Sequence, residues 1–177
     1  MAKIKIGDAA LAFELPGVDG KTHSLADISA GKKATVVVFT CNHCPYVLGW
    51  MGRLIAMAKD YAGQGVAFAG INANDPNKYP VDSFEGMQKF AQEYDLPYLY
   101  LHDETQEVAT AYGAERTPEV FMFDADLKLR YHGAPDDNYD ETQATVPYLQ
   151  NALEAVLAGQ KPPVADTPPV GCTIKWK

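Results

Sequence analysis

Basic residues and long hydrophobic runs are both scarce in this 177-residue sequence. Its 15 Lys and Arg stand against 23 Asp and Glu, which gives a formal charge of -8. A chain with this charge repels phosphate backbones and anionic lipid, so we expect no nucleic-acid partner. The strongest apolar run covers residues 34–39 and is far shorter than the roughly 20 residues that a membrane-spanning helix needs. We therefore expect no membrane partner either.

The N-terminal region lacks the uninterrupted apolar stretch of a secretory signal. Asp8, Glu14 and Asp19 divide the region where such a stretch would lie. We therefore expect a cytoplasmic protein.

Cysteine is also scarce. The sequence has Cys41, Cys44 and Cys172, and three cysteines cannot all pair within one chain. Few disulfides persist in a reducing cytosol, so the closely spaced pair is expected to serve chemistry rather than structure.

The composition present in the chain is that of a globular protein, with 47% hydrophobic and 21% charged residues. This excludes an intrinsically disordered chain. A unit of this length buries roughly 70% of the surface of its unfolded chain. We expect one domain, residues 1–177, made of a β-containing lead-in (1–33), a core (34–159) and a Pro-rich tail (160–177).

Hydrophobic patterning predicts strands that alternate with helices. Unbroken apolar runs at 34–39, 66–71 and 97–101 are typical of buried strands. Helical periodicity follows each of them, and Asp82 with Glu85 forms a candidate capping box for the second helix. Segments 119–123 and 127–131 then predict an antiparallel hairpin before a last helix that ends at Gly159. The order predicts an α/β fold with parallel strands and an antiparallel edge.

The segment Cys41-Asn42-His43-Cys44 carries the strongest chemical signal, where the first buried strand gives way to a helix. Cysteines three residues apart in a first helical turn have Cα atoms about 5–6 Å apart, within reach of a disulfide. The positive end of the helix dipole is expected to lower the pKa of the Cys41 thiol, and a charged His43 would stabilise its thiolate further. We predict that Cys41 is the nucleophile and that Cys44 resolves the mixed disulfide.

Metal and haem sites fit this segment less well. Structural zinc usually needs four ligands in two knuckles, and there is no second Cys-x-x-Cys in the sequence. Haem attachment needs His directly after the second cysteine, where Pro45 stands. We expect no metal and no cofactor beyond a redox-active disulfide between Cys41 and Cys44.

The sequence resembles the thioredoxin-like superfamily, in particular the bacterial AhpC/TSA-type branch of redoxins, peroxiredoxins and thiol-disulfide oxidoreductases. The motifs that carry the resemblance are Gly7-Asp8, Leu15-Pro16, Asp19-Gly20, the Cys41–Cys44 unit and Thr117-Pro118-Glu119. The resemblance implies a thioredoxin-like fold, with a central mixed sheet flanked by helices and an N-terminal β extension. It implies thiol or disulfide proteins or small molecules as substrates, and an unidentified dithiol reductant.

The same resemblance implies roles for Thr117 and Pro118. Pro118 would lie in a cis-proline loop beside the two cysteines, and the backbone of Thr117 would pair with an extended thiol substrate. By itself the sequence says only that Pro118 begins a strand, and trans is the commoner isomer of such a bond.

The sequence also departs from the thioredoxin pattern. Asn42-His43 stands between the cysteines, where thioredoxins usually have a proline. A histidine just before the second cysteine resembles the more oxidising disulfide oxidases and isomerases, which implies a redox couple less reducing than that of thioredoxin. The buried acid six residues before the first cysteine is replaced by Thr35. Glu119 is a candidate proton acceptor for Cys44, although we favour a surface position for it, as we do for Arg116.

Two other functions stay open. The first is a peroxiredoxin-like, antioxidant peroxide reductase that uses Cys41 and is recycled by Cys44 or Cys172. Its family motif requires Pro seven residues and Thr or Ser three residues before the reactive cysteine, and neither Cys41 nor Cys44 meets either condition. The second is a redox sensor or metal-binding module without turnover.

Cys172 has two interpretations. It is a third redox group, relaying a disulfide from Cys41, if the tail folds back over the core. Otherwise it is an apolar anchor beside Ile174 and Trp176, since a free cysteine behaves as a small hydrophobic residue. We favour the anchor because no spacing in the sequence supports the relay.

Overall fold

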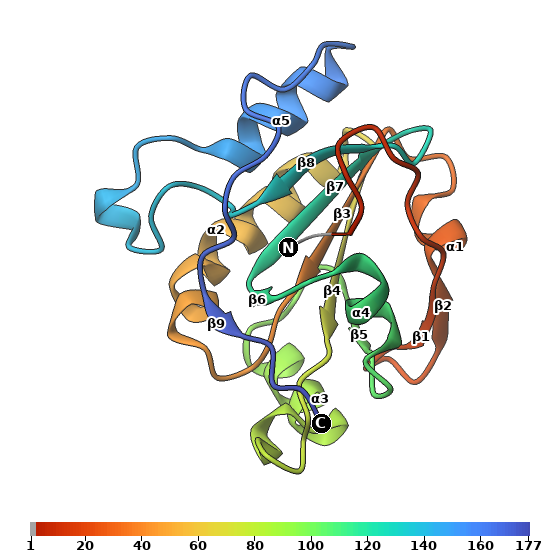
Figure 1. Ribbon diagram of the computed structural model, residues 1–177, viewed down its shortest axis with the longest axis vertical. Coiled ribbons are helices and arrows are strands. Elements are labelled where there is room, and N and C mark those ends of the chain that lie inside the picture. Colours follow the sequence, from red (N-terminus) through yellow and green to blue (C-terminus); the bar gives the residue numbers. More distant parts are fainter. Residues whose placement is uncertain (1–2) are drawn as a thin grey trace.

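The computed structural model describes residues 3–177, and a five-stranded sheet lies at its centre (Figure 1). The strand order is β5-β4-β3-β7-β8, with β3, β4 and β5 parallel and β7 and β8 antiparallel to their neighbours. The strands are β3 Ala34–Phe39, β4 Val66–Asn72, β5 Leu99–His102, β7 Glu119–Asp124 and β8 Leu129–Gly133. The predicted mixed sheet and its antiparallel hairpin are confirmed.

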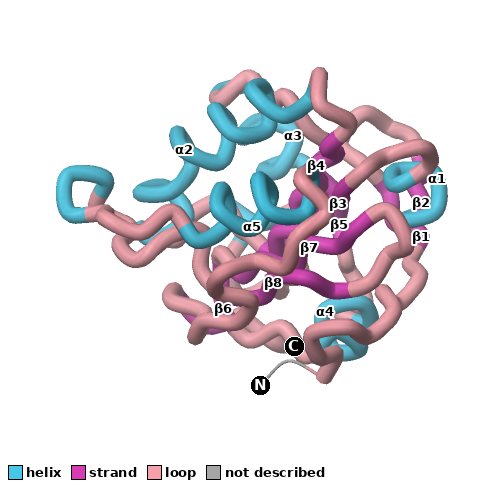
Figure 2. Tube along the Cα trace, turned by 90° about the horizontal axis from the view of Figure 1, so that it is seen from above, coloured by secondary structure: helices cyan, strands magenta, loops and turns pink. Residues whose placement is uncertain are grey.

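Helices cover both faces of the sheet (Figure 2). All six residues of β3 are buried because alternate side chains enter two different cores. One core contains Val36 and Val38 with α2 (Pro45–Ala62) and α5 (Tyr148–Leu157). The other contains Val37 and Phe39 with α1 (Leu25–Ser29) and α4 (Glu107–Tyr112). A third cluster joins α2 to α3 (Phe84–Glu93) beside the cysteines. The unbroken apolar run of β3 thus reflects burial on two sides.

The N-terminal lead-in contains β-structure, as predicted, and the structure shows it as a short hairpin. Its strands β1 (Glu14–Pro16) and β2 (Thr22–Ser24) pair antiparallel and lead directly into α1. Short 3-10 helices lie at Pro80–Asp82 (η1) and Glu141–Gln143 (η2). Among residues 3–177, none of the helices has the length and apolar character needed to cross a bilayer.

Two helices begin later than the sequence suggested. Helix α2 starts at Pro45 with Cys44 as its N-cap, because proline suits the first helical position. Cys41 therefore lies in the preceding loop, and the prediction that both cysteines share a first helical turn is wrong. In α3 the N-cap is Ser83, whose hydroxyl accepts from the amide of Gly86. The predicted capping box with Asp82 as N-cap is wrong, because the Asp82 carboxylate instead accepts hydrogen bonds from the loop between the cysteines.

The Pro-rich tail returns to the middle of the molecule. In Figure 1 it descends from α5, passes β6 (Arg116–Thr117) and ends near α3. Its strand β9 (Cys172–Thr173) pairs antiparallel with β6, and Cys172 stands opposite Thr117. The tail therefore brings Cys172 back to the core, and it does so next to the segment before Pro118.

Candidate active site

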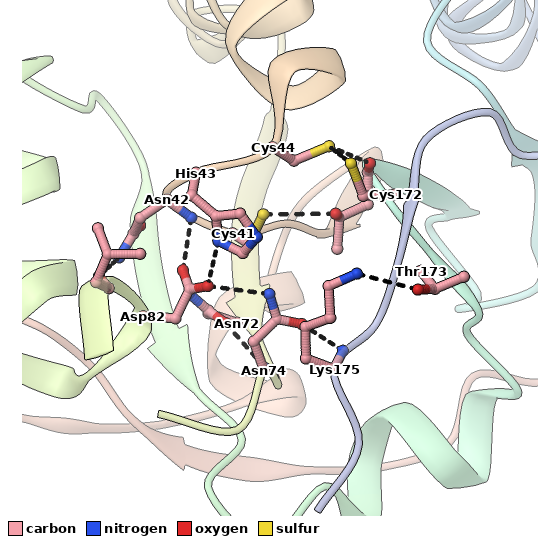
Figure 3. Close-up of polar contacts among 12 residues, drawn as sticks. Cys41, Asn42, His43, Cys44, Asn72, Asn74, Asp82, Cys172, Thr173 and Lys175 are labelled. Carbon is pink, nitrogen blue, oxygen red and sulfur yellow. Dashed lines mark hydrogen bonds and ion pairs between the residues drawn. The ribbon is translucent and has the colours of Figure 1, made fainter. Parts of the chain in front are cut away.

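The fold gathers three cysteine thiols at the N-terminal end of α2 (Figure 3). The sulfur atoms of Cys44 and Cys172 lie 2.7 Å apart, and the thiol of Cys41 hydrogen bonds to Cys44. Cys41 and Cys44 are 1% and 0% exposed, whereas Cys172 is partly exposed. The tail does fold back, which is the condition set for Cys172 as a third redox group. Its other interpretation, an apolar anchor, stays open, since its side chain packs against the cluster that contains Cys41 and Cys44. Ile174, which is 3% exposed, is the buried anchor of this segment.

Thr117 and Pro118 lie beside the cysteines, as the resemblance implied. The Thr117–Pro118 peptide bond is cis. The hydroxyl of Thr117 lies 3.5 Å from the sulfur of Cys41, and the thiol of Cys44 donates to the carbonyl oxygen of Thr117 at 3.4 Å. This one residue thus contacts both members of the pair, which fixes their position relative to the loop before Pro118.

The three thiols ionise differently. The hydrogen bond from Cys41 lowers the pKa of Cys44, and the Cys172 thiol and the backbone amide of Val47 lower it further. The same hydrogen bond to Cys44, together with burial, raises the pKa of Cys41, and the negative charge of Asp82 adds to this rise. Burial and the hydrogen bond to Cys44 raise the pKa of Cys172.

The predicted low pKa of Cys41 is therefore wrong. The causes are the hydrogen bond to Cys44 and burial. Cys41 also lies in the loop before α2, whereas Cys44 is the N-cap, where partial positive charge favours a thiolate.

A buried carboxylate holds the loop between the two cysteines. Asp82 is 0% exposed and accepts from the amide of Asn42 at 2.7 Å and from His43 Nδ1 at 2.6 Å. It also accepts from the side-chain amides of Asn72 and Asn74, at 3.1 and 3.0 Å. His43 thus faces Asp82 through Nδ1. Its predicted role as a charge that stabilises the Cys41 thiolate remains untested.

Asn42 is fixed from both ends of its side-chain amide. Its Nδ2 donates to the carbonyl of Val81 at 2.8 Å, and its Oδ1 accepts from the hydroxyl of Tyr100 at 2.6 Å. The ring of His43 stacks on Tyr79 with 4.7 Å between centroids. The loop that carries both cysteines is therefore held in one conformation before any substrate arrives.

One group of possible metal ligands exists among the described residues. Atoms of Cys41, His43 and Asp82 lie within 4.8 Å of one another. However, each carboxylate oxygen of Asp82 already accepts two hydrogen bonds. One of these four bonds comes from Nδ1 of His43, the ring nitrogen that faces Asp82. A metal ion would have to break several of these buried hydrogen bonds, which is costly. The expected absence of a metal stays a prediction.

Glu119 is buried rather than on the surface, so the interpretation favoured from the sequence is wrong. Its Oε2 accepts from the amides of Glu115 and Arg116, and its Oε1 pairs with His132 Nε2 at 2.8 Å. Both oxygens therefore support the loop before Pro118. Arg116 is exposed, as expected, and donates to the carbonyl of Gly171 in the tail.

Sequence reasoning missed the polar residues that support the site. Asn72 and Asn74 come at the end of β4, which pairs with β3, the strand that leads to Cys41. Because the carboxyl ends of neighbouring parallel strands meet at one edge, these polar residues were a usable signal. Asp82 and Tyr100 gave no such signal, since only the tertiary structure brings them to Asn42.

Comparisons with known proteins identify the family of this chain. The model of the AhpC/TSA family matches residues 6–132. The crystal structure of an uncharacterised conserved protein from Geobacillus kaustophilus is 43% identical, with a TM-score of 0.93 over 99% of this chain and 95% of that one. A hypothetical protein from Sinorhizobium meliloti 1021 is 37% identical, with a TM-score of 0.93 over 99% and 96%.

A relative with a named activity is more distant. The thiol-disulfide oxidoreductase ResA of Geobacillus thermodenitrificans is 25% identical over 130 residues, which are 72% of this chain and 68% of that protein. The family match covers well over half of the sequence and includes both Cys41 and Cys44. This chain, with its mixed sheet and its cysteine pair at the start of α2, belongs to the AhpC/TSA family of the thioredoxin-like proteins.

Proposed function

We propose that this protein is a thiol-disulfide oxidoreductase in which Cys44 is the nucleophile and Cys41 resolves. The observation that carries the assignment is the position of Cys44, as N-cap of the 18-residue helix α2 with a lowered pKa. A thiolate at ordinary pH is the species that attacks disulfides. The assignment reverses the roles that the sequence suggested for the two cysteines.

Exchange proceeds in two balanced steps. The Cys44 thiolate attacks one sulfur of a substrate disulfide, forms a mixed disulfide and releases the other substrate sulfur as a thiolate. The Cys41 thiolate then attacks the Cys44 sulfur and releases the second substrate thiol. The substrate is reduced by two electrons, and Cys41 and Cys44 are oxidised to a disulfide, which a dithiol reductant reopens.

The order of ionisation suits these steps. While Cys44 carries a negative charge, its hydrogen bond to Cys41 keeps the Cys41 thiol protonated. The mixed disulfide removes that charge, so the pKa of Cys41 falls and this thiol can ionise when it is needed. Cys41 is thus unreactive until the substrate is attached.

Thiol or disulfide proteins are the substrates that this chemistry serves, and a dithiol must return the electrons. The cytoplasmic location expected from the sequence would supply such dithiols.

Reduction of insulin disulfides by the protein, with dithiothreitol as the electron source, tests the proposal. Cys44→Ser should abolish turnover. The double variant Cys41→Ser/Cys172→Ser keeps Cys44 alone and should stop at a mixed disulfide on Cys44, visible by mass spectrometry. A double variant that forms no adduct, or a Cys44→Ser protein that still turns over, would exclude Cys44 as the nucleophile. Consumption of hydrogen peroxide with a sulfenic acid at Cys44 or Cys41 would favour the peroxide reductase instead.

A further inference from the structure

The C-terminal strand lies where a substrate peptide is expected to bind. Strand β9 extends β6 by antiparallel pairing, and Cys172 stands opposite Thr117. Thr117 is the residue whose backbone is expected to pair with an extended thiol substrate. In this arrangement the sulfur of Cys172 lies 2.7 Å from that of Cys44, as the sulfur of a docked substrate would. Figure 3 shows the two sulfur atoms facing each other.

The fit of this strand depends on glycine at position 171. A Cβ atom there would lie 2.0 Å from the carbonyl oxygen of Thr117 and 2.7 Å from its carbonyl carbon. Both are backbone atoms of the loop before Pro118, which cannot move aside cheaply. Gly171 therefore allows the close approach that places Cys172 on Cys44.

Contacts on both sides of β9 hold the tail in register. Upstream, Asp166 pairs with His132 at 2.8 Å, and the hydroxyl of Thr167 accepts from the amide of Ala134 at 3.0 Å. Downstream, the amide of Lys175 donates to Asn74 Oδ1 at 2.9 Å. The position of Cys172 beside Cys44 is thus fixed by contacts of the tail on both sides of β9.

We propose that Cys172 is a third redox-active cysteine, which forms a disulfide with Cys44 and makes the C-terminal strand a built-in substrate. The inference rests on the proposed function, since it needs Cys44 as the reactive thiol. The strand covers Cys44 while the protein is at rest and competes with external peptides for the edge of β6.

The covalent steps balance with a disulfide substrate as the oxidant. Once Cys44 carries one substrate sulfur, the Cys172 thiolate attacks the Cys44 sulfur and releases that substrate as a thiolate. The substrate has then gained two electrons, and Cys44 and Cys172 have lost them to their new disulfide. The Cys41 thiolate next attacks Cys44 and frees Cys172, an exchange without net redox change. A tethered thiol at an effective concentration on the order of millimolar or above outcompetes dilute external thiols.

The test is a disulfide map of Cys41→Ser protein. The reduced variant is exposed to oxidised glutathione, quenched with acid, alkylated and analysed by mass spectrometry. We expect a Cys44–Cys172 disulfide in most molecules. Glutathione on Cys44 with an alkylated Cys172 would overturn the inference. The variant Cys41→Ser/Cys172→Ser provides the glutathione adduct as a reference, and circular dichroism checks folding.

A second variant tests the strand without touching a sulfur atom. Adding Gly171→Ala to Cys41→Ser should lower the yield of the Cys44–Cys172 disulfide by roughly tenfold, because the undocked tail loses its effective concentration. Gly63→Ala is the matched control, since its Cβ would meet no atom within 4 Å. Equal yields from the two variants would contradict the role of the docked strand.

Insulin reduction separates this inference from the proposed function. With Cys41 and Cys44 intact, Gly171→Ala should reduce insulin disulfides faster than wild type because the strand no longer covers Cys44. A variant slower than wild type would contradict the covering role. If the wild-type protein does not reduce insulin disulfides, the proposed function is contradicted. The disulfide map still tests whether Cys172 forms a disulfide with Cys44.

Discussion

The sulfur atoms of Cys44 and Cys172 lie 2.7 Å apart although the two residues are 128 positions apart in the chain. This contact joins the N-terminus of α2 to the last strand, and Thr117 lies beside both. The cysteine pair is therefore part of a three-thiol site that is closed by the protein's own tail.

Removal of the Asp82 charge should loosen the loop between the cysteines. Asp82→Asn keeps the size of the side chain but loses the charge that accepts from His43 and Asn42. We expect a loss of about 1–3 kcal/mol in the free energy of unfolding, measured in urea, because hydrogen bonds to a buried charge are strong. The pKa of Cys41 should fall, since the Asp82 charge raises it. Asp126→Asn, in an exposed turn, is the control; an equal loss of stability there would contradict this role of Asp82.

The hydroxyl of Tyr100 should matter more than that of Tyr98. Tyr100 donates to Asn42 at 2.6 Å and accepts from Asn72 at 3.1 Å in a buried position. Tyr100→Phe removes the hydroxyl, so Asn42 and Asn72 each lose a hydrogen-bond partner. We expect a loss of about 1–2 kcal/mol in the free energy of unfolding. Tyr98→Phe loses only a 3.7 Å contact with the sulfur of Met51 and should be nearly neutral. Similar thermal midpoints for the two variants would show that Asn42 does not depend on Tyr100.

His132 should make the stability depend on pH. Burial alone would lower its pKa, but hydrogen bonds to Glu119 and Asp166 outweigh burial and raise the pKa above its ordinary value of 6.5. Because the pKa of His132 is higher in the folded chain than in the unfolded chain, protonated His132 and its carboxylate partners stabilise the fold fully below pH 6.5. This stabilisation is lost as the pH rises through the folded-state pKa.

Urea unfolding of wild type and His132→Gln at pH 6 and pH 9 measures this effect. The difference in stability between the two proteins should be larger at pH 6. His23→Gln, which removes the His23 pair with Asp19, controls for the loss of any histidine. A difference that is the same at both pH values would show that protonation of His132 does not stabilise the fold.

The fold could be predicted because its signals are local. The apolar run 34–39 specifies a strand, the periodicity after Cys44 specifies a helix, and segments 119–123 and 127–131 specify a hairpin. The alternation of strand and helix specifies how these elements connect. The expectation that both cysteines lie in the first helical turn was wrong although a local signal was available. Pro45 marks the first position of α2, and this makes Cys44, not Cys41, the cap.

The rest of the site depends on contacts between distant segments. Asp82 and Ser83 are equally good caps by sequence. The position of the Asp82 carboxylate is decided by its buried partners from distant segments, among them the side-chain amides of Asn72 and Asn74. The pairing of β9 with β6 likewise leaves no periodic pattern in a Pro-rich tail. These features follow from tertiary packing and not from local propensity.

Residue-resolved alkylation of the reduced protein with iodoacetamide, followed by mass spectrometry over a pH series, tests the central claim most directly. The hydrogen bond from Cys41 lowers the pKa of Cys44 to about 4. The rate at Cys44 should therefore be nearly constant between about pH 6 and pH 9, while the rates at Cys41 and Cys172 rise only in alkali. A Cys44 rate that climbs through the ordinary thiol pKa of about 8.5, with Cys41 reacting at lower pH, would contradict the account.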